Sequence, residues 1–270
     1  MYNLSQLFRI QKTLRNLNYP DYQRVSKEIA IYAEDEKKLE KILRQIKTRK
    51  PWEYIQGQTE FYTLSFKVNR GVLIPRIETE QLVSTAIQEY KEKVFDMVID
   101  VGTGSGCIII SLLKSLQLPS IFSGNTKKTD FLATDISQKA LNIAKDNIKK
   151  YKLGKKINLI KSNLIKNIDL NKKSVLVLAN LPYIPTEQYK KLNKDVKSFE
   201  PKLALDGGKD GNKYYKELFK QIEESKYKNF TLILETEPSI LKNTQNIFKK
   251  YKTVVLKDTY KKDRFIIVRG

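Results

Sequence analysis

The sequence contains no histidine and a single cysteine, Cys107, among its 270 residues. A disulfide framework within one chain is therefore excluded, and so are zinc sites of the usual cysteine and histidine type. A general base or nucleophile relay built on imidazole is excluded as well. We expect no metal site, and we expect any chemistry to depend on a cofactor, on carboxylates or on positioned amides.

Long hydrophobic runs are also absent. No apolar stretch approaches the roughly 18 residues that a membrane span requires, and the first residues lack a basic region followed by an apolar signal core. We therefore expect a cytoplasmic protein without membrane contact. Its 270 residues, of which 40% are hydrophobic, are enough for one good core and a small accessory domain.

Negative charge is scarce, because 30 acidic residues face 51 lysines and arginines, which gives a net charge of +21. Such an excess suits an acidic partner such as RNA or DNA. The lysines, however, are scattered along the whole chain and accompany abundant asparagine and isoleucine, a pattern that AT-rich coding produces without any partner. We favour coding bias over a nucleic-acid partner and expect that nucleic acid is not required.

An apolar run with a polar end organises the chain. Residues 175–179 are typical of a central strand in a parallel sheet. Asn180 then offers a carboxamide, Pro182 holds Leu181 extended, and Tyr183 adds an aromatic face. These four residues form a candidate clamp for a planar amide or amine, and a plain exit from strand to loop is the alternative interpretation.

A glycine-rich turn follows a second predicted strand, residues 97–101, and precedes an apolar helix over residues 108–116. Glycines let a ligand approach the main chain, and a helix N-terminus offers free N–H groups. A dinucleotide fingerprint would have its third glycine at position 107, where the sequence has Cys107. The spacing Asp100-x-Gly-x-Gly-x-Gly instead predicts S-adenosylmethionine. The turn itself consists of Gly102, Thr103, Gly104, Ser105 and Gly106.

Two further predicted strands place polar residues at the same edge of the sheet. The strand over residues 131–135 ends in Asp135, whose carboxylate can accept both hydroxyls of a ribose. The alternative role for Asp135 is a helix N-cap, for which Ser137 competes. A strand over residues 157–160 leads to Asn163 and Leu164, which would face an adenine.

The alternation of strands and helices from Val94 onward predicts a doubly wound α/β sheet. Its last elements are expected as strands over 230–235, 253–256 and 264–268 and a helix over 238–250. Residues 1–50 have helix-spaced apolar sets, Leu4, Leu7, Phe8 and Ile10 and then residues 29–46, and predict a small helical domain. Residues 51–93 predict a linker with a β-hairpin, strands 64–68 and 72–74 around Asn69-Arg70-Gly71, and a helix that begins near Thr79.

From Pro51 onward the chain resembles the glutamine N5-methyltransferases that modify peptide chain release factors. The resemblance implies a class I Rossmann-like methyltransferase fold, with a seven-stranded, mostly parallel sheet over residues 94–270, and S-adenosylmethionine as the cofactor. Two of its blocks, Pro-Arg-x-Glu-Thr and Leu-x-Gly-Gly-x-Asp-Gly, are much more specific than the others. The blocks are Tyr54-Ile-x-Gly57, Ile74-Pro-Arg76-x-Glu78-Thr79-Glu80, Asp100-x-Gly-x-Gly-x-Gly106, Asp135, Asn180-x-Pro-Tyr183, Glu200-Pro201 and Leu205-x-Gly-Gly-x-Asp-Gly211.

The resemblance also implies roles for individual residues. Arg76, Glu78 and Thr79 would line the cofactor site, although chemistry alone favours a solvent-exposed ion pair between Arg76 and Glu78. The family usually has Asn-Pro-Pro-Tyr where this chain has Leu181, and an aspartate where it has Asn163. The predicted catalytic residues are Asn180, Leu181, Pro182 and Tyr183. The predicted cofactor residues are Gly102, Thr103, Gly104, Ser105, Gly106, Asp135, Asn163, Leu164, Asn180, Arg76, Glu78 and Thr79.

The predicted function is methyl transfer from S-adenosylmethionine to N5 of the glutamine in the Gly-Gly-Gln loop of release factors, by a monomer. One alternative is an adenine-N6 nucleic-acid methyltransferase, which the same Asn-x-Pro-Tyr geometry and the positive charge would suit. A second is a glutamine methyltransferase that acts on a ribosomal protein. A third, for which Leu181 leaves room, is a catalytically silent binding protein that kept the fold.

Overall fold

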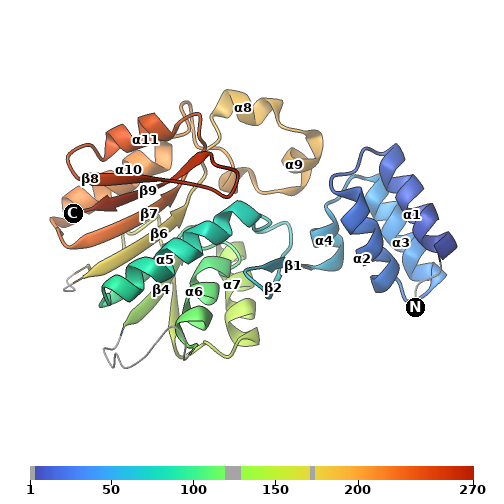
Figure 1. Cartoon of the computed structure of the whole chain (residues 1–270), viewed down its shortest axis with the longest axis horizontal. Helices are drawn as coiled ribbons and strands as arrows, with labels where there is room; N and C mark the ends of the chain where they lie inside the picture. The colour runs from blue at the N-terminus through green and yellow to red at the C-terminus, as the bar shows by residue number, and fades with distance from the viewer. Residues whose placement is uncertain (1–3, 119–128, 171–173) are drawn as a thin grey trace.

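The computed structural model describes residues 4–118, 129–170 and 174–270 (Figure 1). Helices at the start of the chain lie to one side, a short β-hairpin follows, and the rest forms a layered α/β unit. Among the described residues, no helix is both long enough and apolar enough to cross a membrane.

A seven-stranded sheet forms the centre of the α/β unit, with the strand order β5-β4-β3-β6-β7-β9-β8. The first five of these strands run parallel, and β9 runs antiparallel to β7 and to β8. This arrangement confirms the expected seven-stranded, mostly parallel sheet. The strands are β3 Met97–Val101, β4 Asp130–Asp135, β5 Ile157–Lys161, β6 Val175–Asn180, β7 Phe230–Glu235, β8 Lys252–Lys257 and β9 Asp263–Arg269.

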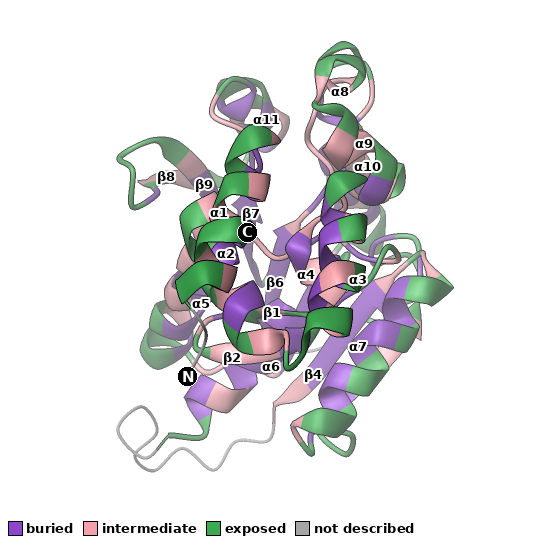
Figure 2. Cartoon of the chain, turned by 90° about the vertical axis from the view of Figure 1, so that its right-hand side faces the viewer, coloured by how far each residue is buried: buried purple, intermediate pink, exposed green. Residues whose placement is uncertain are grey.

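Helices cover both faces of the sheet, so the central strands are apolar throughout instead of alternating. Every residue of β3 is buried, with Val98 in one core and its neighbour Ile99 in the opposite one. Figure 2 shows this arrangement as buried strands beneath helices whose outer faces are exposed. One core includes residues of α5 Glu80–Glu92, α6 Cys107–Leu116 and α7 Gln138–Lys150, and the other includes residues of α10 Lys213–Ser225 and α11 Leu241–Ile247.

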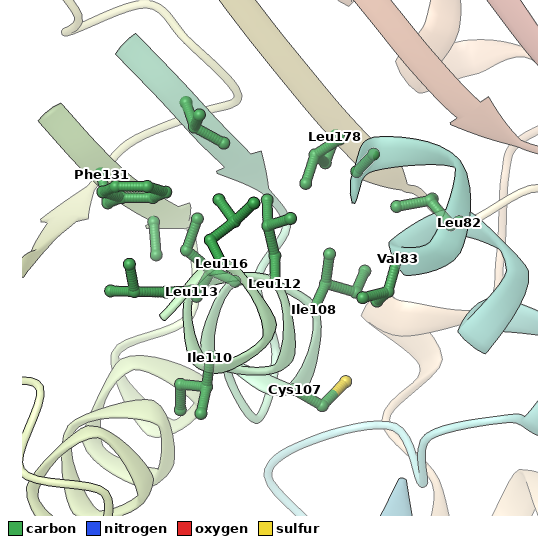
Figure 3. Packing of buried hydrophobic residues seen from close by; sticks show 14 of the residues in the cluster. Leu82, Val83, Cys107, Ile108, Ile110, Leu112, Leu113, Leu116, Phe131 and Leu178 are labelled. Carbon is green, nitrogen blue, oxygen red and sulfur yellow. The ribbon is translucent and has the colours of Figure 1, made fainter. Parts of the chain in front are cut away.

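Helix α6 is anchored by its apolar side chains, as Figure 3 shows. Ile108 lies beside Val83 of α5, and Leu112 points toward the strands that carry Phe131 and Leu178. Complete burial of a side chain of this size contributes about 1.5–3 kcal/mol. The N-terminus of α6, where the glycine-rich turn ends, is therefore held firmly against the sheet.

The helices before the sheet have a core of their own, in which Trp52 is buried. The helical run expected over 29–46 is divided in two, because Asp35 caps a new helix with its side chain. Leu4 and Phe8 were expected on the apolar face, and this was wrong, because both are exposed. The helices are α1 Leu4–Asn16, α2 Tyr22–Tyr32, α3 Glu36–Lys47 and α4 Trp52–Gln56. The division of the chain into domains at 1–50, 51–93 and 94–270 stays a prediction.

The β-hairpin between these helices and the sheet begins earlier than predicted. Strand β1 Gln58–Phe61 pairs antiparallel with β2 Leu64–Lys67, and only Tyr62 and Thr63 separate them. Both turn residues have positive φ angles, 50° and 61°, as in the type I′ turns that suit two-residue hairpins. The turn lacks the glycine or asparagine that usually announces this geometry, so the sequence pattern did not reveal it.

The predicted strand over 64–68 is confirmed as β2, but the predicted strand over 72–74 and the hairpin around Asn69-Arg70-Gly71 were wrong, although that segment does turn. The Gly71 N–H donates to the Asn69 side chain over 2.7 Å. Val72 packs into a small core with Tyr54, and the Tyr54 hydroxyl donates to the Val72 carbonyl over 2.5 Å. The chain after the turn is held by this contact instead of pairing as a strand, and it runs on toward the carboxyl edge of the sheet.

The helix expected over 238–250 is shorter than predicted, because α11 begins at Leu241 and ends at Ile247. Three-residue turns close both ends: the Leu241 N–H donates to the Pro238 carbonyl, and the Phe248 N–H donates to the Gln245 carbonyl. The remaining elements are short. They are the 3₁₀ helices η1 Ile77–Thr79 and η2 Lys202–Ala204 and the helices α8 Thr186–Lys191 and α9 Lys194–Phe199.

Candidate active site

The carboxyl ends of β3, β4 and β6 open onto a cleft with a volume of about 540 Å³. Strands β4 and β6 lie on opposite sides of β3, and ligands of open α/β sheets bind at such a switch point. The volume falls within the range of cofactor sites. The predicted site residues that line the cleft are Arg76, Thr79, Gly102, Thr103, Gly104, Ser105, Asp135, Asn163, Leu164, Asn180, Leu181 and Pro182.

The glycine-rich turn is held in place from both sides. The Thr103 hydroxyl donates to Oδ2 of Asp100 over 2.6 Å, and the Gly104 N–H donates to Oδ2 of Asp135 over 3.0 Å. Gly104 has a φ of 56°, and a Cβ added to it would meet no atom closer than 4.0 Å. Gly106 has a different role, because it begins α6 and packs closely against the side chain of Ile110.

Asp135 ends β4 with its carboxylate at the cleft. Its Oδ1 accepts the N–H of Ser137 over 2.8 Å, while Oδ2 accepts the N–H of Gly104. Burial raises the pKa of Asp135, and these two backbone hydrogen bonds oppose the rise. The N-cap of α7 is Ser137, whose hydroxyl accepts the Ala140 N–H. The alternative role of Asp135 as the cap is therefore wrong.

The remaining wall of the cofactor end is mixed in polarity. Leu164 is buried, with a left-handed φ of 54°, and Asn163 beside it is exposed. Ile136 also lines the cleft and is 51% exposed, although no sequence motif marks it. A carboxylate at a strand end, a backbone turn without bulky side chains and a wall of mixed polarity are features that S-adenosylmethionine requires. The residues present therefore fit that cofactor.

Asn180 ends β6 at the other end of the cleft. Its Nδ2 donates to the hydroxyl of Thr79 over 2.9 Å. Because the amide nitrogen is used in this way, Oδ1 is the end of the carboxamide that is left for a ligand. Thr79, predicted as lining of the cofactor site, is 2% exposed and is placed as the partner of Asn180.

Leu181 is buried and lies across the glycine-rich turn. A Cβ added to Gly102 would lie 3.2 Å from Cδ2 of Leu181. The Leu181 carbonyl lies 3.5 Å from the hydroxyl of the buried Tyr215, whose proton also reaches the Glu235 carbonyl. The residue that departs from the usual Asn-Pro-Pro-Tyr pattern therefore fills space against the turn, and its carbonyl is held in a defined place.

The loop over residues 200–211, which is acidic and rich in glycine, lies directly against the backbone that follows Pro182. The Ile184 N–H donates to the Leu205 carbonyl over 3.0 Å, and the Gly207 N–H donates to the Ile184 carbonyl over 2.8 Å. A Cβ added to Gly207 would lie 2.6 Å from the Pro182 carbonyl oxygen, and one on Gly211 would be closer still to a Tyr183 backbone atom. The block Leu-x-Gly-Gly-x-Asp-Gly thus allows two backbone segments to touch, and it braces the segment that carries the predicted clamp.

Arg76 does not pair with Glu78, so the predicted ion pair was wrong. Its Nη2 lies 2.6 Å from Oε1 of Glu200, which is buried. Burial lowers the pKa of Arg76, but the charge and hydrogen bond of Glu200 more than offset this and raise it. Arg76 lines the cleft, whereas Glu78 lines a second cleft toward the N-terminal helices. The ion pair between Arg76 and Glu200 joins the Pro-Arg-x-Glu-Thr block to the start of the loop over residues 200–211.

Of the four predicted catalytic residues, all of which the structure describes, Tyr183 is the one that does not line the cleft. It packs, half-buried, against the core that contains α10. Other residues line the cleft although they were not predicted as site residues. Leu73, Pro75, Leu203, Lys213 and Tyr214 come from loops and helix starts far from β6 in the sequence, where no local pattern marks them.

Known proteins resemble this chain over most of its length. No family model matches the chain. The chain is 35% identical over 237 residues to the release factor glutamine methyltransferase of Flavobacterium psychrophilum, which covers 85% of this chain and 79% of that protein. It is 33% identical to the protein of the same name from Clostridium botulinum, over 94% of this chain and 85% of the relative. A third relative of that name, from Streptococcus pneumoniae, is 31% identical over 96% of this chain and 89% of the relative.

A solved structure shares the fold at much lower identity. The hMettl16 catalytic domain in complex with MAT2A 3'UTR hairpin 6 aligns with a TM-score of 0.54 and 17% identity, over 77% of this chain and 76% of that one. At this identity the likeness concerns the arrangement of helices and strands alone.

Proposed function

The chain belongs to the release factor glutamine methyltransferase family, and we propose from this premise that it methylates a release factor with S-adenosylmethionine. The acceptor is the side-chain amide nitrogen, N5, of the glutamine in the Gly-Gly-Gln loop. One observation carries the proposal at the level of the site: the Asn180 carboxamide has its nitrogen bound to Thr79, beside the glycine-rich turn. Its oxygen is left as an acceptor for an amide N–H.

The reaction depends on alignment. An amide nitrogen is a poor nucleophile, because its lone pair is delocalised into the carbonyl. The cofactor, when bound, supplies a methyl group that its sulfonium already activates. Oδ1 of Asn180 and the Leu181 carbonyl each accept one N–H of the substrate amide and aim the nitrogen. Orientation of this quality can supply on the order of 7–11 kcal/mol.

The remaining roles follow from the walls of the cleft. Pro182 holds Leu181 extended, and Tyr183, which packs against the core that contains α10, supports this segment from behind. Asp135 would hold the cofactor by its ribose hydroxyls, and Asn163 would accept a hydrogen bond from the adenine amino group beside Leu164. The product amide keeps one N–H, and the proton lost from nitrogen passes to solvent. No residue has to act as a strong base in this scheme, which agrees with a sequence that has no histidine.

The proposal includes the partner and the state of the enzyme. A release factor is the protein substrate, the enzyme acts as a monomer, and nucleic acid is not required. The test is incubation with S-adenosylmethionine labelled in its methyl group and, separately, release factor, ribosomes, DNA or RNA. We expect label on the glutamine of the Gly-Gly-Gln loop. Label on adenine or on a ribosomal protein, or no label at all, would overturn the assignment.

A further inference from the structure

Behind Asn180 lies a buried carboxyl that the mechanism above does not use. Asn180 and Glu235 are paired residues at the ends of the neighbouring strands β6 and β7. Glu235 is 1% exposed, and its Oε2 accepts no hydrogen bond from any residue that the structure describes. Such a group is costly to bury, because it loses water and gains no full set of partners. Its presence calls for an explanation.

The Thr79 hydroxyl connects the two residues. It accepts the Nδ2 proton of Asn180 over 2.9 Å, and the carboxyl of Glu235 lies beside it, where the hydroxyl proton can point to it. A hydroxyl has one proton, so it donates to one partner while it accepts from another. An ionised Glu235 can only accept. The Thr79 proton therefore points to Glu235, and the lone pair of the hydroxyl points to Asn180.

The direction of that proton decides which end of the carboxamide faces the substrate. With the lone pair of Thr79 toward Asn180, Nδ2 is drawn to Thr79 and Oδ1 faces the cleft. With the proton reversed, Oδ1 would turn to Thr79 and the amino group would face the cleft, where it could not accept a substrate N–H. We propose that Glu235 is a positioning residue that, through Thr79, sets the orientation of the Asn180 carboxamide. The inference rests on the proposed function for its kinetic consequence.

The charged groups around Glu235 do not replace this role. Arg264 approaches from β9, but its Nε lies 2.7 Å from Asp258, with which it is paired. Arg76 is paired with Glu200. Tyr215 reaches the backbone carbonyl of Glu235 and not its carboxyl. The titratable and charged groups that face Glu235 are Arg264, Arg76, Glu78, Tyr183 and Tyr215.

The arrangement makes activity sensitive to pH. Burial raises the pKa of Glu235 to about 7, against the hydrogen bond from Thr79 and the charge of Arg264. A protonated Glu235 can donate, so the constraint on the Thr79 proton is released as the pH falls through 7. We expect kcat to fall several-fold below pH 7. Asp100 also has a pKa near 7, so a variant of Glu235 is needed to assign the effect.

The first test compares Thr79→Val, Thr79→Ser and a matched control, Thr85→Val. Thr85 is also buried, and its hydroxyl donates only within α5, to the Gln81 carbonyl over 2.8 Å. We expect Thr79→Val to lower kcat for release factor by about tenfold to a hundredfold, with the dissociation constant of S-adenosylmethionine within about threefold of wild type. Thr79→Ser should recover most of the loss, and Thr85→Val should show none of it. Equal kcat values for wild type and Thr79→Val would overturn the inference.

The second test uses Glu235→Gln and adds a readout that does not depend on turnover. The glutamine amide can donate to Thr79, so we expect a lower kcat and loss of the fall in activity near pH 7. In nuclear magnetic resonance spectra, the Asn180 side-chain N–H signals should shift with a midpoint near pH 7 in wild type and not in Glu235→Gln. An Asn180 signal that titrates identically in both would refute the inference. A protein that methylates no release factor but shows this titration would refute the proposed function alone.

Discussion

The Asn180 carboxamide is the single group on which the proposed transfer depends. Its geometry is set by neighbours that come from three separate segments: Thr79 before α5, Leu181 after β6 and Glu235 at the end of β7. A free asparagine at a strand end would present either end of its amide, because nitrogen and oxygen are of equal size. The surrounding hydrogen bonds remove that ambiguity.

Replacement of Asn180 by alanine tests its role. We expect Asn180→Ala to lower turnover by at least about a hundredfold, because one of the two acceptors that align the substrate is lost. The dissociation constant of S-adenosylmethionine, measured by calorimetry, should change little. Asn142→Ala, at an exposed position of α7, is the control and should keep full activity. A near-normal rate for Asn180→Ala would sink the assignment.

Asp135 is the matching residue at the cofactor end. We expect Asp135→Ala to raise the dissociation constant of S-adenosylmethionine by about tenfold or more, because a charge-assisted acceptor for the ribose is lost. The N–H of Gly104 also loses its partner in this variant. Calorimetry measures the change, with Asp146→Ala on the exposed surface of α7 as the control. An unchanged constant for Asp135→Ala would mean that the cofactor binds elsewhere.

The loop over residues 200–211 is the element that holds the predicted clamp, residues 180–183, from outside the sheet. Its contacts with the Tyr183–Pro185 region are made by backbone atoms, so they tolerate no side chain at Gly207 or Gly211. The Pro182 carbonyl and the Tyr183 Cα would both lie within 3 Å of a new Cβ at Gly207. These atoms belong to the backbone and cannot rotate away.

We therefore expect Gly207→Ala to reduce the free energy of unfolding by about 1–3 kcal/mol and to lower kcat as the clamp is displaced. Gly154→Ala is a matched control, because a Cβ at Gly154 would meet nothing within 4 Å. Urea unfolding and methyl transfer to release factor measure the two effects. If both variants behave alike, the loop is not the brace that the contacts indicate.

Two buried carboxyls affect the whole molecule through its stability. Burial raises the pKa of Asp100 to about 7, from 3.8 in an unfolded chain. Burial also raises the pKa of Glu235. A carboxyl whose pKa is raised by folding binds its proton more tightly in the folded state. The stabilisation is complete below the unfolded pKa and is lost as the pH rises through the folded one.

The free energy of unfolding should therefore decrease between about pH 4 and pH 7. For Asp100 alone the decrease is on the order of 4 kcal/mol. Asp100→Asn should remove this part of the slope, because an amide keeps an acceptor for Thr103 but does not ionise. Urea unfolding at several pH values measures the slope. A slope that is the same in Asp100→Asn and wild type would contradict the argument.

Most of the sheet could be predicted from the sequence. The strands at 97–101, 131–135, 157–160, 175–179 and 230–235 lie within a residue or so of those observed. Four of them are runs buried on both faces, so their apolar composition is a local signal, whereas the edge strand at 157–160 is only partly buried. The hairpin was placed wrongly, because Tyr62 and Thr63 adopt positive φ angles without the usual turn residues. The helix at 238–250 was predicted too long, since its closing turns depend on packing.

The site residues likewise divide into those that a local motif predicts and those that it does not. The glycine-rich turn, Asp135 and Asn180 could be predicted as lining of the cleft, because each is a short motif at the end of an apolar run. The pairing of Arg76 with Glu200 and the place of Thr79 between Asn180 and Glu235 follow only from the packing of the folded chain. These contacts join residues more than 100 positions apart in the chain. Their partners are chosen by the order of strands in the sheet, which no local pattern of side chains encodes.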